Sequence, residues 1–441
     1  MKPLPPRFSG MQGYMVVLLG QSVSQLGSAL SRFAIGIWIY QLTGSVTQFA
    51  LATFFGIAPA VLLAPFVGSL VDRWDRRWAM ILSDTGAGIG TLILALLMWS
   101  GRVEIWHLYL VIASNAAFGT IQFPAFSAAT TLLVPRERLN QANGLATFGH
   151  SLVSLLAPLI AGFLIGTIEL AGIILIDGAT CLFAVLTLLM IRISRPVDER
   201  LPEETAGSLL EESLFGWRYI RTRPGLLGLL LVFAAVNFAT ALVQTLITPL
   251  VLSFATSAVL GSVVTGAGLG LLAGGILMSL WKGPEQRVRA ILAVLAFQGL
   301  MLLLGGWRPN ASLIAASAFL YLACVPVLNA CSQTIWQSKV PPAIQGRVFS
   351  IRQMIPGATL PLGALLAGPL ADGIFEPLLA PGGALAGSVV GHVLGVGPGR
   401  GIGFLFVAMG CLVVLTAVVG WRRTSLRNVE TDLPDALPQE S

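Results

Sequence analysis

The stretch GSLVDRWDRR, residues 68–77, joins two long apolar runs, and it is the segment that decides the fold. Five of the six residues from Asp72 to Arg77 carry a charge, although charged residues make up only 10% of the chain. An ordinary soluble domain contains about 25% charged residues. So dense a group of charges between two hydrophobic runs is typical of a short loop at a membrane surface.

The composition of the rest of the chain indicates a helical membrane protein. Of the 441 residues, 55% are hydrophobic, and the mean hydropathy is +0.84. A helix needs about 20 mostly apolar residues to cross a bilayer, and runs of this length recur without the alternation of a transmembrane β-barrel. The net charge of +6 fits basic loops at a membrane, so we expect no nucleic-acid partner. The four cysteines lie in apolar runs without metal-binding spacing, and we expect neither a metal nor a cofactor.

The apolar runs predict twelve membrane-spanning helices, six on each side of the long polar segment 193–223. Their expected bounds are 14–40, 47–71, 78–100, 107–133, 142–167, 170–192, 226–253, 258–281, 289–306, 311–337, 347–371 and 401–421. The expected domains are an N-terminal six-helix bundle (1–192), a cytoplasmic linker (193–225), a C-terminal six-helix bundle (226–421) and a cytoplasmic tail (422–441). In the linker, Leu210, Leu214, Trp217 and Ile220 recur at helical spacing, which predicts an amphipathic helix on the membrane surface.

The distribution of basic residues predicts the orientation of the chain. With both termini inside, the cytoplasmic segments contain 21 of the 26 lysines and arginines. The external loops contain three of them, and the spans contain the remaining two, Arg32 and Arg352. Because basic residues accumulate on the cytoplasmic side of membrane proteins, we expect a multi-pass protein of the cytoplasmic membrane with both termini in the cytoplasm.

An internal repeat relates the two sets of six spans. GSLVDRW at 68–74 matches GILMSLW at 275–281 with an offset of 207, and LIAG at 159–162 matches LLAG at 365–368 with an offset of 206. A Val-Pro pair between these stretches also repeats at 206. The matches predict an all-α fold of two pseudo-symmetric six-helix bundles, a transporter architecture with its substrate site between the halves.

The loop 68–77 resembles the signature sequence between the second and third helices of major facilitator superfamily transporters, Gly-x-Leu-x-Asp-Arg-x-x-Arg-Arg/Lys. The positions that fit are Gly68, Leu70, Asp72, Arg73, Arg76 and Arg77. VPPAIQGRVFS (340–350) and ADGIFEPLLAPGG (371–383) resemble the macrolide-efflux and siderophore-export permeases of this superfamily. The resemblance implies a secondary transporter, not an enzyme, that exports a small amphipathic or hydrophobic drug or secondary metabolite by alternating access.

The energy source is constrained by what the sequence contains. No nucleotide-binding loop of the form G-x-x-x-x-G-K-[ST] occurs, so an ion gradient or the solute's own gradient must supply the energy. The resemblance implies proton antiport, and APLIAG (157–162) partly resembles the fifth-helix antiporter motif. Two residues depart from the family pattern: Asn115 replaces a fourth-helix arginine, and Arg32 lies in the first helix, where proton-coupled drug antiporters often carry an acid. The candidates for coupling are Asp177, His150 and Asp372.

The resemblance also implies that the charged loop latches the two halves together on the cytoplasmic side. Asp72 is expected at the positive N-terminal end of the helix that begins near 345–347. The alternative is that the charges only enforce topology, and in the second repeat Ser279 replaces the aspartate. The residues assigned to this gate are Gly68, Asp72, Arg73, Arg76, Arg77, Asp84, Arg347 and Arg352.

Polar side chains inside the spans are the candidates for a substrate cavity, because such groups are costly in a membrane unless they are paired or functional. Arg32 and Asp177 lie at similar depth, where they form an ion pair, or Arg32 faces the cavity and meets an anionic or polar group of the substrate. His150 is either a packing residue or a proton carrier. The cavity candidates are Gln21, Gln25, Arg32, Asn115, Gln122, Asn237, Gln244, Asn329 and Gln333.

Other functions stay open on the sequence alone. The alternatives are export of a self-made metabolite such as a siderophore, import of a solute, and a non-transporting sensor or scaffold. The Gly-rich outer loop 373–403 is either a re-entrant lid or a floppy connector. The expected partners are a small-molecule substrate, the lipid bilayer and protons, and the expected oligomeric state is a monomer.

Overall fold

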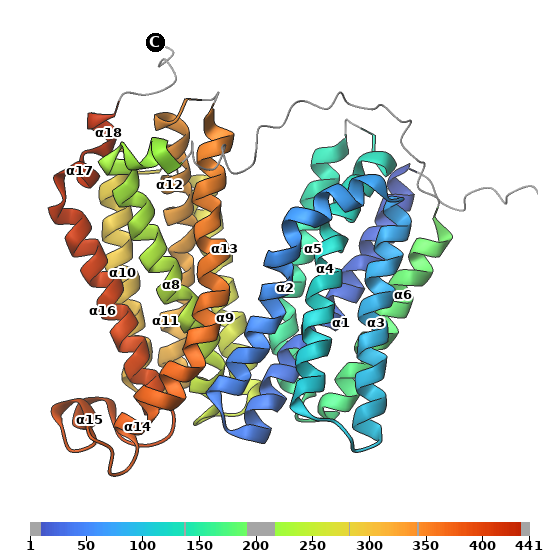
Figure 1. The fold of residues 1–441 in the computed structure, drawn as a ribbon, viewed down its shortest axis with the longest axis horizontal. Coiled ribbons are helices and arrows are strands. Elements are labelled where there is room, and N and C mark those ends of the chain that lie inside the picture. Colours follow the sequence, from blue (N-terminus) through green and yellow to red (C-terminus); the bar gives the residue numbers. More distant parts are fainter. Residues whose placement is uncertain (1–9, 136–137, 192–216, 282, 342–343, 434–441) are drawn as a thin grey trace, which may run out of the picture. The chain divides into compact units, whose positions relative to one another are not determined.

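The computed structural model describes residues 10–135, 138–191, 217–281, 283–341 and 344–433, and in these ranges it is helical without any strand. The chain divides into two compact units. The first comprises Met1–Arg200 with Leu260–Ser262, and the second comprises Leu201–Val259 with Val263–Ser441. Figure 1 draws the helices of the first unit in blue to green and those of the second in green to red.

The first unit contains six long helices. They are α1 (Gly10–Thr43), α2 (Val46–Arg73), α3 (Arg76–Trp99), α4 (Ile105–Leu133), α5 (Leu139–Leu164) and α6 (Glu169–Met190). α1 packs along α6 and α5, and α3 lies between α4 and α6. Two apolar clusters hold the bundle, one around Tyr14, Met80 and Leu188, the other around Ile39 and Ile174. α1, α3 and α6 therefore share a long, closely packed interface.

The second unit contains a comparable bundle with extra short helices at both ends. Its elements are α8 (Pro224–Leu252), α9 (Ser257–Leu280), α10 (Arg287–Trp307), α11 (Ala311–Ala323), α12 (Val325–Lys339), α13 (Gln345–Leu370), the π-helix η3 (Ala371–Phe375), α14 (Glu376–Leu379), α15 (Val389–Leu394), α16 (Arg400–Arg422), α17 (Thr424–Arg427) and α18 (Val429–Asp432). α14 and α15 lie at the opposite end of this unit from α17 and α18 (Figure 1). α10 packs along α16 so closely that a side chain on Gly306 would collide with the carbonyl oxygen of Gly403.

The long helices agree with the predicted spans to within four residues, the largest difference being the start of the first span at Gly10 instead of 14. Eleven helical segments among the described residues are long and apolar enough to cross a membrane, with Ala311–Lys339 as one of them. That segment is interrupted at Cys324, where Pro326 lies in the first turn of α12. α1 is not among the eleven, although it has 34 residues. Its many serines and glutamines lower its hydropathy.

The structure describes only the end of the predicted membrane-surface helix of the linker. Leu210 and Leu214 lie outside the described residues, whereas Trp217 and Ile220 belong to a short helical turn. Ile220 is fully buried within the protein, and the hydroxyl of the adjacent Tyr219 donates to the carbonyl oxygen of Lys339 at 3.5 Å. Ile220 therefore packs on the second unit, whereas Trp217 is 42% exposed, and the contact of this helix with the membrane surface stays a prediction.

The outer loop and the C-terminal tail are both folded. Glu376 accepts hydrogen bonds from the backbone N–H groups of Gly399 at 3.2 Å and Ile402 at 2.9 Å, so its carboxylate holds the start of α16. This contact and the helices α14 and α15 show that 373–403 is not a floppy connector. In the tail, Val429 is fully buried, and Glu430 forms an ion pair with Arg287 at 3.5 Å. α17 and α18 are thus part of the second unit.

Candidate functional site

A polar cavity of about 360 Å³ lies within the first unit. One wall is a stripe of α1, in which Gln21, Gln25, Ser28 and Arg32 recur every three or four residues and so share one helix face. α3, α4 and α5 contribute the other walls. The sequence folds this way because the apolar residues of α1 occupy the remaining faces, against α5 and α6.

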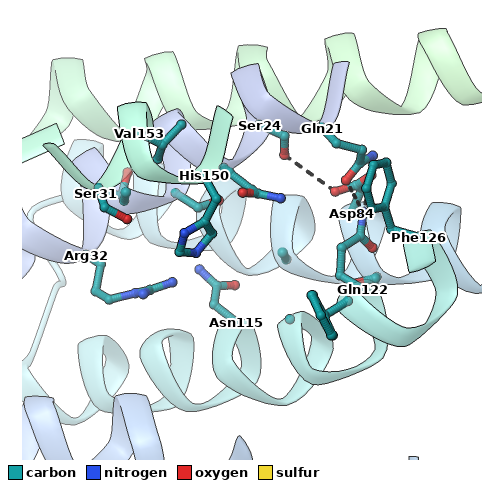
Figure 2. Close-up of a pocket in the computed structure, with 18 of the residues that line it drawn as sticks. Gln21, Ser24, Ser31, Arg32, Asp84, Asn115, Gln122, Phe126, His150 and Val153 are labelled. Carbon is teal, nitrogen blue, oxygen red and sulfur yellow. Dashed lines mark hydrogen bonds between the residues drawn. The ribbon is translucent and has the colours of Figure 1, made fainter. Parts of the chain in front are cut away.

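Asp84 lies at one end of this cavity, at the centre of a hydrogen-bond network (Figure 2). The amide of Gln21 donates to its carboxylate at 2.8 Å and that of Gln122 at 3.3 Å. Gln122 also donates to the side-chain oxygen of Gln21, and Ser24 donates to Asp84 at 3.4 Å. Asp84 is 6% exposed. The sequence assigned Asp84 to the cytoplasmic gate, but its described partners are cavity residues, because its face of α3 turns toward α1 and α4.

The other part of the cavity contains Arg32, Asn115 and His150, whose side chains project into it (Figure 2). The expected ion pair between Arg32 and Asp177 does not form within the described part of the chain. Asp177 accepts hydrogen bonds from Ser28 at 3.0 Å and from Thr91 at 3.2 Å instead. Arg32 lines the cavity and is attracted electrostatically to Asp177 without a direct ion pair. That it meets a group of the substrate stays a prediction.

The second unit has its own cavity of about 660 Å³, with more aromatic walls. The lining aromatic side chains are Phe233, Tyr321, Trp336 and Phe349. Arg352 was also assigned to the gate, but it lines this cavity because it lies two turns inside α13. Its guanidinium donates to Gln333 at 2.6 Å and to Ser332 at 3.3 Å, and it lies 5.7 Å from the centre of the Trp336 ring.

All nine predicted cavity residues line one of the two cavities. The first unit supplies Gln21, Gln25, Arg32, Asn115 and Gln122, and the second supplies Asn237, Gln244, Asn329 and Gln333. The coupling candidates are spread out: His150 lines the first cavity, Asp177 is fully buried beside it, and Asp372 lies in η3, away from both cavities. The structure thus groups the amides into two sets but does not join the three coupling candidates.

Only part of the predicted latch can be examined. The side chains of Asp72, Arg73 and Arg347, and the surroundings of Gly68, lie outside the described residues. Asp75 accepts from the backbone N–H groups of Arg77 and Trp78 and so caps α3. Arg77 donates to the carbonyl oxygens of Leu188 and Leu189 at 2.8 and 2.9 Å, and Arg76 donates to Trp74 within the loop at 3.1 Å. These three contacts lie within the first unit, and the latch stays a prediction.

Several residues of the site were missed from the sequence. They are Ser24, Ser28, Ser31, Thr91, Cys181, Tyr321 and Trp336. A usable signal existed for the serines, which continue the helical spacing of Gln21, Gln25 and Arg32. The sequence held no comparable signal for Cys181, because a cysteine within an apolar run is ordinary core composition.

The arrangement of amides, serines and a few ionisable groups is suited to binding a solute. Among the described residues no three histidine, cysteine or acidic side chains come together as a metal site. The side-chain oxygens of Asn115 and Gln122 are buried and accept no hydrogen bond within the described chain. Unpartnered buried acceptors are costly, and donors of a solute or of water inside the cavity would satisfy them.

Comparison with known proteins agrees with this architecture. Macrolide efflux protein A from Streptococcus pyogenes is 26% identical over 370 residues, which cover 82% of this chain and 90% of that protein. Enterobactin exporter EntS from Shigella boydii is 26% identical over 369 residues, which cover 81% and 85%.

The fold has close counterparts among solved structures. A bacterial homologue of the human lysosomal transporter Spinster superposes with a TM-score of 0.66 at 16% identity, covering 96% of this chain and 99% of that one. Identity this low shows a common fold only. The family model of the Major Facilitator Superfamily matches residues 17–364. The chain therefore belongs to the Major Facilitator Superfamily, a family of multi-pass membrane transporters and not of enzymes.

Proposed function

We propose that this transporter exports a small amphipathic compound, a drug or a secondary metabolite, by alternating access. The observation that carries the proposal is the pair of cavities, each lined by amides and at least one ionisable side chain inside an apolar helical bundle. Intramembrane polar groups that face a cavity mark solute pathways in transport proteins. Two relatives with wide coverage are named as an efflux protein and an exporter, which favours export over import.

Each cavity, taken by itself, suits particular chemical groups of such a compound. In the second unit, Trp336, Phe233 and Phe349 would cover its apolar body, while Gln333 and Arg352 would bind oxygen atoms on it. In the first unit, the free acceptors of Asn115 and Gln122 would take its hydroxyl or amino groups. A large apolar surface with a few placed polar groups is the usual construction of a small-molecule site.

The proposal also covers the membrane topology of the chain, its cytoplasmic latch and its energy source. The excess of basic residues in the expected cytoplasmic segments supports a topology with both termini in the cytoplasm. In this topology Asp72 with the arginines of 68–77 would latch the cytoplasmic side in one state of the transport cycle. A proton gradient would drive the cycle. The proposal takes the protein to act as a monomer.

One observation favours an acidic metabolite as a second candidate substrate. Arg352 is the only charged side chain among the described residues that line the second cavity. A guanidinium without an acidic neighbour there suits carboxylate or catecholate oxygens, and one relative is named an enterobactin exporter.

Transport by the purified chain in lipid vesicles tests the proposal. A radiolabelled macrolide and enterobactin are the two probes, and we expect wild-type protein to exchange at least one of them across the membrane. The variant Gln333→Leu removes a cavity amide and should reduce the exchange, whereas Ser279→Ala, on the helix that repeats α2, should not. If neither probe moves in either direction, the proposed export function is wrong.

A further inference from the structure

A continuous chain of hydrogen-bonding side chains joins two buried carboxyl groups within the α1, α3 and α6 interface. Ser24 lies between the two ends: its hydroxyl is 3.4 Å from a carboxylate oxygen of Asp84 and 3.8 Å from the sulfur of Cys181. Cys181 is in turn 3.7 Å from a carboxylate oxygen of Asp177. Ser28 and Thr91 fix the Asp177 carboxylate from α1 and α3. Every step of the chain is made by side chains from different helices or from successive turns of α6.

Neither carboxyl group forms an ion pair among the described residues, although Arg32 lies near enough to attract Asp177 electrostatically. Asp84 is 6% exposed and Asp177 is 0% exposed, and no ion pair within the described part of the unit includes either of them. Arg32, the one arginine in the cavity wall, makes no ion pair with Asp177, and His150 is the other titratable group that lines the cavity. A carboxyl group that is buried in a membrane and makes no direct ion pair is suited to binding a proton.

The two ends of the chain differ in their access to the cavity. Asp84 lines the cavity and contacts the amides of Gln21 and Gln122, whereas Asp177 is closed off behind α1. Thr91, which contacts Asp177, lies seven residues after Asp84 on α3, which corresponds to about 10 Å along the helix axis. The chain thus connects a cavity-facing acid with an enclosed acid about a third of the hydrocarbon thickness away.

We propose that Asp84, Ser24, Cys181 and Asp177 form a proton relay that couples the first cavity to the interior of the α1, α3 and α6 interface. In one proton transfer along the relay, protonated Asp84 gives its proton to the Ser24 oxygen while the Ser24 hydroxyl hydrogen moves to the Cys181 sulfur. The thiol hydrogen of Cys181 moves at the same time to the Asp177 carboxylate. Asp84 ends as a carboxylate and Asp177 as a carboxylic acid, and Ser24 and Cys181 remain neutral.

This inference rests on the proposed export function, and its test separates the two. The full chain in vesicles is assayed with a radiolabelled macrolide in two ways, as exchange without an ion gradient and as accumulation driven by an imposed pH gradient. We expect Cys181→Val and Asp177→Asn to lower the ratio of pH-driven accumulation to exchange by about tenfold or more, since positioned proton-transfer groups contribute at least that much. Cys181→Ser, which keeps a hydrogen-bonding group, should retain most of the ratio. Cys331→Val, at a similarly buried cysteine of the second unit with 3% exposure, is the matched control.

A structural role would give a different result. The relay is wrong if Cys181→Val lowers exchange and pH-driven accumulation equally, or leaves both unchanged. It is also wrong if a sodium gradient can replace the pH gradient as the driving force in the wild type. If wild-type protein moves no probe, the export proposal fails, and infrared spectra of the purified chain over a pH series decide the relay independently. Asp177→Asn should then shift the titration of the carboxylic C=O band that Asp84→Asn removes. An unshifted titration overturns the relay.

Discussion

The cavity of the first unit is smaller than that of the second, about 360 against 660 Å³, and it is lined by different chemistry. Its walls contain Arg32, Asp84 and His150 among serines and amides, and two phenylalanines. The second cavity has four aromatic side chains and Arg352 as its charged group among the described residues. Two bundles built on one repeated plan have therefore diverged in what their cavities can bind.

The difference suggests that the two units have different roles in transport. Both carboxyl groups of the proposed relay lie in the first unit, together with His150. The second unit has the volume and the apolar surface that a bulky solute needs. We therefore expect substitutions in the first unit to act mainly on coupling, and substitutions in the second to act mainly on affinity for the solute.

The largest expected effect comes from the charged loop, where the two units differ most clearly. Asp72→Asn removes the acid of the signature motif, and transport should fall by up to about a hundredfold if the charge supports a latch worth about 1.5–3 kcal/mol. The matched change is Ser279→Asn, because Ser279 occupies the repeated position and donates only to Ile276 of its own helix at 2.7 Å. Initial rates of macrolide exchange in vesicles measure both, with membrane insertion checked by size-exclusion chromatography. Equal rates for wild type and Asp72→Asn would remove the latch.

The charge of the second cavity gives the next effect. Arg352→Gln should raise the KM for enterobactin about tenfold, because a charge-assisted contact to an acidic solute is lost. Arg352→Lys should recover part of this affinity, and the KM for an uncharged macrolide probe should change much less. Concentration-dependent exchange in vesicles measures each value. An equal change for both probes would show that Arg352 acts through the structure of Gln333 and Ser332 and not through its charge.

The close helix contacts of the two units predict a smaller effect, on stability. A side chain on Gly306 would collide with backbone of α16, which cannot move alone, whereas a side chain on Gly20 would collide with the hydroxyl of Thr187. Gly306→Ala should therefore lower the free energy of unfolding by about 1–3 kcal/mol through overpacking. Gly20→Ala should lower it by an amount at the low end of that range or below it. Thermal unfolding in detergent micelles should show the lower Tm for Gly306→Ala. The reverse order would mean that α1 and α6 are the more rigid pair.

The long helices and the polar residues within them could be predicted from the sequence, whereas the direction of individual side chains could not. Each long helix was predicted within four residues, because the membrane requires long apolar runs whatever their neighbours are. The amides of the cavities were predicted for the same reason, since polar groups at membrane depth need a partner or a function. The sequence gives depth along a helix but not the direction in which a side chain points. Asp84 and Arg352 were therefore assigned to the gate without foresight that they line the cavities, and their gate role stays a prediction.

The residues that sequence reasoning missed are those whose role depends on contact between helices. Ser24 and Cys181 are ordinary residues in apolar runs, and only the packing of α1 against α6 brings them within reach of each other. Ile220 was predicted to face lipid, because helical spacing alone cannot distinguish a lipid surface from a protein surface.

The smallest predicted effect concerns the basic side chains that hydrogen-bond carbonyl oxygens at helix ends within each unit. Arg77 binds the last carbonyl oxygens of α6, whereas the repeated position of the second unit is Pro284, and there Lys339 binds the carbonyl oxygens of Glu430 and Leu433. Arg77 is only half-buried, so Arg77→Gln should cost about 0.5–1 kcal/mol of stability. Arg76→Gln, whose bond stays within the loop, should cost less. If Arg77→Gln instead stops transport without lowering the Tm, Arg77 works with Asp72 in the latch, because loss of a purely structural contact must appear in the unfolding transition.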